Sequence, residues 1–218
     1  MDAVLFDLDN TIYDHKQYFL SALKEIAGYL AKKYKLPKAE IYEVSVSLWH
    51  KKTSAYPFLF NDLLKVLKIK DDKSLRSLVR MFNRHKCVLK AYPGVKTVLK
   101  KLKKQGYILG IITDGNVKRQ AGKIKKLGIK KFFKIIIYTK MIAEKPSAKP
   151  FLAAAAKLKI DPRDAVFVGD NPAIDFKGAK DVGMKTVRVL TGEFSGRKSN
   201  KYIDREIRGL SGVFKALK

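Results

Sequence analysis

The sequence predicts an α/β protein that consists of a parallel sheet and one all-helical insertion. Two observations predict this fold. From residue 95 onward, short apolar runs alternate with amphipathic segments, which is the pattern of consecutive βαβ units. Before that point, a single apolar run is followed by a long segment, residues 15–89, in which apolar residues recur at helical spacing. A helical segment therefore interrupts the sheet directly after its first strand.

The first element is a short buried strand at residues 3–7, where four apolar residues lead into Asp7. The helical segment follows, with Pro37 and Pro57 at the expected starts of helices. Tyr92, Pro93 and Gly94 mark its end, because proline and glycine favour turns. We therefore predict a core made of residues 1–14 and 90–218 and a separate helical unit at 15–89.

The remaining elements alternate regularly along the chain. We predict helices at 95–104, 117–127, 149–158 and 173–182, and strands at 107–113, 133–139, 165–169 and 185–190. Connections of this kind place neighbouring strands parallel, with helices covering the sheet. Ligands bind beyond the carboxyl ends of such strands. An insertion that leaves from this edge is expected to cover the site.

The composition is strongly basic. Lys and Arg number 47 against 20 Asp and Glu, a formal net charge of +27. A heat-adapted surface is one interpretation, but heat adaptation enriches Lys and Glu together, and acidic residues are too few here to pair with the lysines. The alternative is a field that attracts anions, which predicts weak, non-specific contact with nucleic acid.

The sequence has no secretory leader and no apolar stretch long enough to span a bilayer. We therefore expect a cytoplasmic protein with no membrane partner. The single cysteine, Cys87, has no second cysteine with which to form an internal disulfide.

Acidic residues cluster where the predicted strands end. Asp7 and Asp9 close the first strand, Thr113 and Asp114 the second, and Asp170 a later one, with Asp175 five residues on. If these strands are parallel neighbours, their ends converge on one cleft, where several carboxylates repel one another unless a cation neutralises them. Carboxylate oxygens favour a hard cation such as Mg²⁺. Any one of these aspartates alone is better explained as a turn or cap residue; the order of all of them favours a site.

Four segments carry a family resemblance. Residues 4–11, with Asp7-Leu8-Asp9-Asn10-Thr11, resemble the first motif of the haloacid dehalogenase superfamily, and residues 111–115 its second. Residues 144–151, with Lys145, are similar to its third motif, and residues 169–175 to its fourth. The resemblance implies a Rossmann-like core with helices on both faces and a helical cap inserted after the first strand. It also implies a phosphatase that acts on a small phosphorylated metabolite.

The resemblance implies a role for each matching residue. Asp7 is the expected nucleophile, Asp9 the proton donor and acceptor, and Thr113 and Lys145 complete the catalytic set. The phosphoryl oxygens are expected to contact Leu8, Thr113, Asp114 and Lys145. Mg²⁺ is expected to bind through Asp7, Asp9, Asp170 and Asp175.

Three other functions stay open at this stage. A phosphosugar mutase of the same superfamily would return the phosphoryl group to a sugar. A phosphonate-cleaving relative would use a lysine of the helical insertion, such as Lys16, Lys51 or Lys52, to form a Schiff base. A polyanion-binding protein with a secondary hydrolase core would account for the charge. Asp9 itself favours phosphate chemistry over dehalogenation, because the dehalogenase branch of the superfamily lacks an aspartate there.

Overall fold

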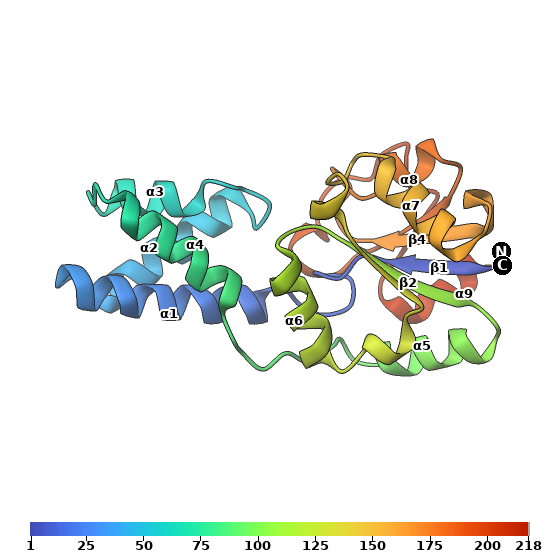
Figure 1. Ribbon diagram of the computed structural model, residues 1–218, viewed down its shortest axis with the longest axis horizontal. Coiled ribbons are helices and arrows are strands. Elements are labelled where there is room, and N and C mark those ends of the chain that lie inside the picture. Colours follow the sequence, from blue (N-terminus) through green and yellow to red (C-terminus); the bar gives the residue numbers. More distant parts are fainter. Residues whose placement is uncertain (218) are drawn as a thin grey trace. The chain divides into compact units, whose positions relative to one another are not determined.

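The computed structural model describes residues 1–217 and contains two compact units (Figure 1). One unit, the core unit, comprises residues 1–15 and the chain from Leu89 onward, and the other, the helical unit, comprises Lys16–Val88. The boundaries expected from the sequence, 15 and 89, differ from this division by one residue at each end. Each unit has its own cluster of buried apolar side chains.

The core unit is a six-stranded, entirely parallel sheet in the order β3-β2-β1-β4-β5-β6. Its strands are β1 (Ala3–Phe6), β2 (Ile108–Thr113), β3 (Ile135–Tyr138), β4 (Ala165–Gly169), β5 (Lys185–Val189) and β6 (Arg205–Ile207). β1 lies at the centre, paired with β2 on one side and β4 on the other. Its four residues are apolar and fully buried, as a strand covered on both faces requires.

Helices cover both faces of the sheet. They are α5 (Val95–Lys104), α6 (Val117–Leu127), α7 (Lys149–Leu158), α8 (Lys177–Asp181) and α9 (Val213–Ala216). Figure 1 shows α7 and α8 above the sheet, and α5 and α9 below it. Phe151 of α7 packs edge-on against Phe167 of β4, with ring centroids 5.0 Å apart. The apolar helix faces and the strands together exclude water from the sheet, as the fold class requires.

The helical unit contains α1 (Lys16–Tyr34), α2 (Lys38–Lys52), α3 (Leu59–Val66) and α4 (Asp72–Arg84). Phe19 stacks on Trp49 at its centre, with ring centroids 4.9 Å apart. Asp71 caps α4, since its carboxylate accepts hydrogen bonds from the backbone amides of Lys73 and Ser74. These four helices therefore fold around a cluster of buried apolar side chains of their own.

Four predicted strands are one or two residues longer at one or both ends than β1, β2, β3 and β5, and two larger differences occur elsewhere. The helix expected at 173–182 is helical at Lys177–Asp181, because Asp175 accepts hydrogen bonds from the backbone amides of Asp170 and Asn171 and holds the preceding residues in a turn. β6 was not predicted, because it is a three-residue edge strand with two exposed residues and no apolar pattern.

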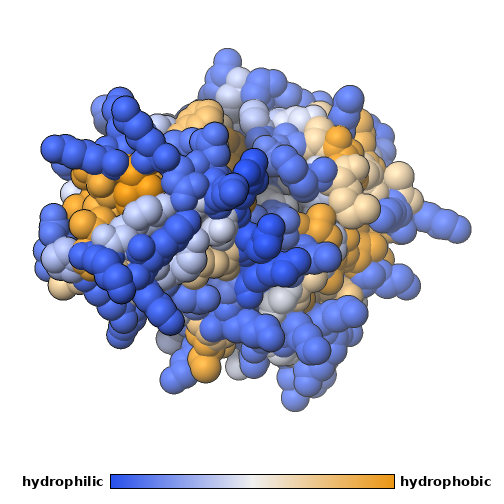
Figure 2. Space-filling view, turned by 60° about the vertical axis from the view of Figure 1, so that its left-hand side comes forward, coloured by the Kyte–Doolittle hydropathy of each residue, from blue (hydrophilic) through white to orange (hydrophobic). Residues whose placement is uncertain are grey.

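The molecular surface is mainly hydrophilic on the face shown in Figure 2, where apolar atoms appear in separate patches. Within residues 1–217, we find no helix long and apolar enough to cross a lipid bilayer.

Candidate active site

The sheet brings the acidic strand ends together. Asp7 follows β1, and its backbone amide donates to the carbonyl of Val168 in β4 at 2.8 Å. Asp170 follows β4, and Thr113 is the last residue of β2. Because β1 lies between these two strands, all three residues lie at the same carboxyl edge. The strand order also reverses direction between β1 and β4: from β1 the chain proceeds to β2 and β3 on one side of the sheet, and then from β4 to β5 and β6 on the other side. Ligands of open parallel sheets bind at such a reversal.

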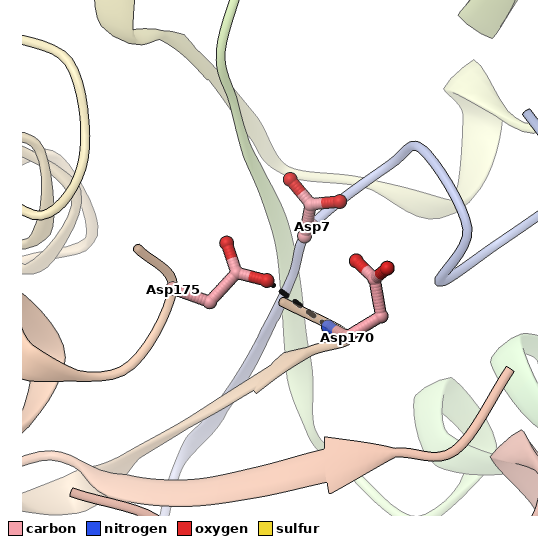
Figure 3. Close-up of side chains that lie close together, drawn as sticks. All are labelled: Asp7, Asp170 and Asp175. Carbon is pink, nitrogen blue, oxygen red and sulfur yellow. Dashed lines mark hydrogen bonds between the residues drawn. The ribbon is translucent and has the colours of Figure 1, made fainter. Parts of the chain in front are cut away.

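Three buried carboxylates form a cluster at this edge. Asp7, Asp170 and Asp175 each place an oxygen within 4.8 Å of the others (Figure 3). Asp175 is held by the backbone, because one of its oxygens accepts from the amides of Asp170 at 3.0 Å and Asn171 at 2.8 Å. Three negative charges so close together in a buried place need a positive partner.

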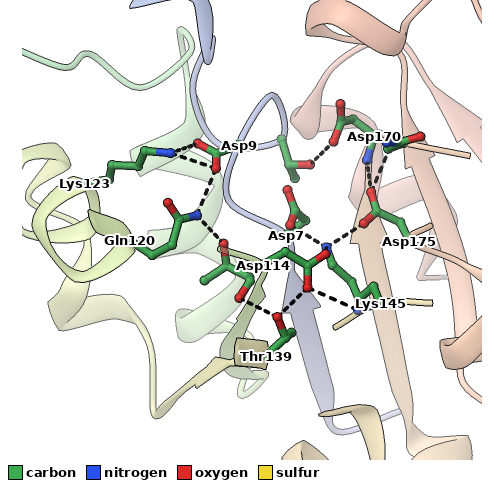
Figure 4. A network of polar contacts seen from close by, with 12 residues as sticks. Asp7, Asp9, Asp114, Gln120, Lys123, Thr139, Lys145, Asp170 and Asp175 are labelled. Carbon is green, nitrogen blue, oxygen red and sulfur yellow. Dashed lines mark hydrogen bonds and ion pairs between the residues drawn. The ribbon is translucent and has the colours of Figure 1, made fainter. Parts of the chain in front are cut away.

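Lys145 supplies part of that positive charge. Its ammonium donates to Asp7 Oδ1 at 2.7 Å and to Asp175 Oδ1 at 2.6 Å (Figure 4). Burial by itself lowers the pKa of Lys145, but the carboxylates of Asp175 and Asp7 raise it well above its usual value. The lysine therefore stays charged, and its side chain is only 2% exposed.

A neighbouring carboxylate fixes the loop that carries Lys145. Asp114 accepts a hydrogen bond from the backbone amide of Lys145 at 3.2 Å, and its same oxygen accepts from the hydroxyl of Thr139. The carboxylate of Asp114 is thus engaged in holding the loop. Its predicted contact with phosphate stays a prediction, as does that of Leu8, which is fully buried beside Asp7.

Asp9 points to a different set of partners. Its carboxylate is directed toward α6, whereas that of Asp7 is directed toward Lys145 (Figure 4). Lys123 donates to both oxygens of Asp9, at 2.7 and 2.9 Å, and Gln120 donates to one of them at 2.9 Å. Gln120 also donates to the hydroxyl of Thr113 at 2.7 Å.

Gln120 and Lys123 were not among the site residues predicted from the sequence. A signal for them was present, since both lie on the buried face of α6 together with Ile124 and Leu127. A lysine on an apolar helix face needs a partner for its charge. Such a position was hard to distinguish in a chain with so many exposed lysines.

The pKa values of Asp7 and Asp9 are shifted in opposite directions. Burial raises the pKa of Asp7 to about 8, although Lys145 lowers it. Burial also raises the pKa of Asp9, but the nearby His15 and Lys123 outweigh burial and hold it well below its usual range. Without further charge at the site, Asp7 tends to hold a proton and Asp9 tends to lose one.

The residues present fit a hard divalent cation. Asp170 Oδ2 is buried and has no hydrogen-bond partner among residues 1–217, so one oxygen of the cluster is left to a group outside the chain. Burial, and then the charges of Asp175 and Asp7, raise the pKa of Asp170 well above its usual value. A cation would relieve this repulsion, and oxygen ligands of this kind suit Mg²⁺.

Two histidines lie outside the cluster of Asp7, Asp170 and Asp175. The Nε2 atom of His15 lies 4.0 Å from Asp9 Oδ1, and His85 contacts Glu25 and Ser21 in the helical unit. The predicted site residues thus form two adjacent groups. One group contains Asp7, Asp170, Asp175 and Lys145. The other contains Asp9 and Thr113, which are connected by Gln120.

Comparisons with known proteins agree with the site. Residues 4–189 match the family model described as "Haloacid dehalogenase-like hydrolase". The chain is 29% identical to a glyceraldehyde 3-phosphate phosphatase of Methanocaldococcus jannaschii, over 99% of this chain and 96% of that protein. It is 33% identical to a protein of the same name from Pyrococcus abyssi, over 88% of this chain and 82% of that one. A solved structure, a HAD phosphatase from Thermococcus onnurineus, has a TM-score of 0.73 at 30% identity, covering 100% of this chain and 98% of that one.

Proposed function

The chain belongs to the haloacid dehalogenase-like hydrolase family and is a hydrolase of phosphate esters, and from that premise we propose that it releases phosphate from a small metabolite through an aspartyl-phosphate on Asp7. The observation that carries the proposal is the buried group of Asp7, Lys145, Asp170 and Asp175 at the carboxyl edge of the sheet. The group supports the proposal because the Lys145 ammonium lies 2.7 Å from the carboxylate proposed as the nucleophile, and a cation there would stabilise charge on a transferring phosphoryl group.

In the first step, an oxygen of Asp7 attacks phosphorus, and the bond from phosphorus to the leaving oxygen breaks. Asp9 gives a proton to that oxygen, so that an alcohol leaves. Thr113 and Lys145 donate to the phosphoryl oxygens, with Leu8 and Asp114 beside them. In the second step, Asp9 takes a proton from water as the water attacks phosphorus, and inorganic phosphate leaves Asp7. The covalent intermediate divides one hard displacement into two easier ones.

The metal proposed for this site is Mg²⁺. The residues that would hold it are Asp7, Asp170 and Asp175 through their carboxylates and Asp9 through its backbone carbonyl, and the unpartnered oxygen of Asp170 supports this choice. The bound ion would supply positive charge that keeps Asp7 ionised and stabilises the transferring group. Asp175 already accepts from two backbone amides and from Lys145, which favours a role in orienting the loop or in binding through water.

We further propose that the helical unit is the cap and selects the substrate. Its chain leaves the core unit shortly after Asp9 and returns before α5, so its connections start at the edge of the sheet that carries the site. Because the relatives reported above are named for glyceraldehyde 3-phosphate, this three-carbon phosphate is the first substrate to test.

Phosphate release from a panel of phosphorylated metabolites and from an aryl phosphate tests the proposal. We expect activity that requires Mg²⁺, is lost with a chelator, and is abolished in Asp7→Asn with the fold intact by circular dichroism. Asp181→Asn is the matched control, since Asp181 is a partly exposed aspartate on α8 that pairs with Lys177. Full activity in Asp7→Asn would remove the mechanism. Transfer of the phosphoryl group to a sugar without phosphate release would favour a mutase instead.

The net charge of +27 supports a second candidate, binding to a polyanion. In that case, binding to nucleic acid would be unaffected by Asp7→Asn and would weaken as salt is added.

A further inference from the structure

The carboxylate of Asp9 is surrounded by hydrogen-bond donors. Lys123 donates to both of its oxygens and Gln120 donates to Oδ2 (Figure 4). The hydroxyl of Tyr13 donates to Oδ1. A carboxylate offers about four lone-pair sites, so these four hydrogen bonds fill it. The position and orientation of the Asp9 carboxylate are therefore set by these three side chains.

Gln120 connects Asp9 to the residue expected to bind phosphate. Its amide nitrogen donates one hydrogen to Asp9 Oδ2 at 2.9 Å and the other to Thr113 Oγ1 at 2.7 Å. A carboxylate only accepts, so the nitrogen and not the oxygen of the amide must face Asp9. Because the hydroxyl of Thr113 accepts from Gln120, its own proton is free to be donated to a different acceptor.

The position of these side chains is unusual for a purely structural role. Gln120 and Lys123 lie three residues apart on one face of α6, and they are 0% and 1% exposed. A buried lysine is costly unless it is paired, and an apolar side chain would fill the same space without that cost. The amide oxygen of Gln120 has no partner within residues 1–217, so the recorded hydrogen bonds of this side chain are its two donations toward the site.

We propose that Gln120 and Lys123 are positioning residues that hold the carboxylate of Asp9 and the hydroxyl of Thr113 in one hydrogen-bonded unit. The inference rests on the proposed function, in which Asp9 transfers protons and Thr113 binds the phosphoryl group. Lys123 donates to both oxygens of Asp9, so it fixes the plane of the carboxylate as well as its position.

The test is a double-mutant cycle. Lys123→Met and Gln120→Met are each made in the wild-type chain and in Asp9→Asn, and kcat/KM is measured with an alkyl and an aryl phosphate. We expect a loss on the order of 10²-fold for the alkyl phosphate, the size typical of a misplaced catalytic group. The aryl phosphate, whose leaving group scarcely needs a proton, should lose less. In the Asp9→Asn background the same substitutions should add little, because the residue through which they act is already disabled.

Two controls keep the outcomes distinct. Lys125→Met replaces an exposed lysine of the same helix and should leave activity unchanged. Gln120→Met is close in size to the original and removes the two donated hydrogen bonds, so it carries the test if Lys123→Met fails to fold. Equal losses in both backgrounds and with both substrates would overturn the inference. A wild-type chain that releases no phosphate from any substrate would overturn the proposed function instead.

Discussion

Gly178 is the position where a single methyl group should disturb the site from a distance. It lies in α8, and an alanine Cβ there would come within 2.5 Å of the backbone oxygens of both Pro146 and Ser147. Neither oxygen belongs to a flexible side chain, so the helix and the loop must move apart. Pro146 directly follows Lys145, whose ammonium contacts Asp7 and Asp175. The strain therefore falls on the loop that positions the charged lysine.

The size of the effect follows from the distances. To reach an ordinary van der Waals contact of 3.4 Å, α8 and the loop must separate by about 0.9 Å. A displacement of about 1 Å at a catalytic group costs on the order of 10²-fold in rate, and overpacking of this kind costs about 1–3 kcal/mol of stability. We therefore expect Gly178→Ala to lower kcat about 10- to 100-fold and to lower Tm by about 2–4 °C for each kcal/mol lost.

The assay is steady-state phosphate release together with thermal unfolding. Gly122→Ala is the matched control, because Gly122 is also a helical glycine but its added Cβ would have no atom within 4 Å. That variant should keep its activity and gain about 0.5–1 kcal/mol from the better helix former. If Gly178→Ala behaves like Gly122→Ala in both measurements, the close approach of α8 does not position Lys145 and the reasoning is wrong.

Three further predictions concern protons, metal and charge. In Asp9→Asn, an aryl phosphate should give a burst of phenol near one equivalent per enzyme, followed by slow turnover. An alkyl phosphate should give no burst, because its leaving group needs the proton that Asp9 supplies. Equal losses of activity for both substrates without a burst would exclude proton transfer by Asp9. The raised pKa of Asp7, about 8, means that the metal-free fold binds a proton that the unfolded chain has lost, so its stability should fall as pH rises from about 4 to 8. Over the same range Mg²⁺ should raise Tm by an increasing amount, and an equal increase at pH 5 and pH 8 would contradict this. Binding to duplex and single-stranded DNA should be weak and fall steeply with salt, and no binding at low salt would leave the excess lysines without this partner.

The sheet and the acidic cluster were predictable from the sequence for a physical reason. A parallel strand buried on both faces is a continuous apolar run, so a polar residue directly after it, such as Asp7 or Asp170, stands out. The helices at 95–104, 117–127 and 149–158 have the predicted bounds because their apolar periodicity is strong. Where a side chain competes for backbone hydrogen bonds, as Asp175 does, the same periodicity overestimates the helix.

The partners of Asp9 were not predictable in the same way. Gln120 and Lys123 lie on α6, whereas Asp9 follows β1 more than 100 residues earlier in the chain. Only the three-dimensional packing of α6 brings their side chains to Asp9. The proposed mechanism needs an ionised Asp7 and an Asp9 that can carry a proton. The structure has unequal environments in the opposite order, with Asp7 favoured to hold a proton and Asp9 to lose it. Charge contributed by the metal and release of Asp9 by its donors are the two changes that would reverse this order.

The central position of β1 has a consequence for how the protein acquires its structure. Its residues pair with strands more than 100 and more than 150 positions later in the chain, whereas the helical unit is one continuous segment, Lys16–Val88, with its own internal contacts. Non-local pairing requires the closure of long loops and slows folding, while local helical contacts form early. The helical unit should thus fold before the strand that precedes it has found its neighbours. Asp7 would then reach its carboxylate partners late, when β4 docks beside β1.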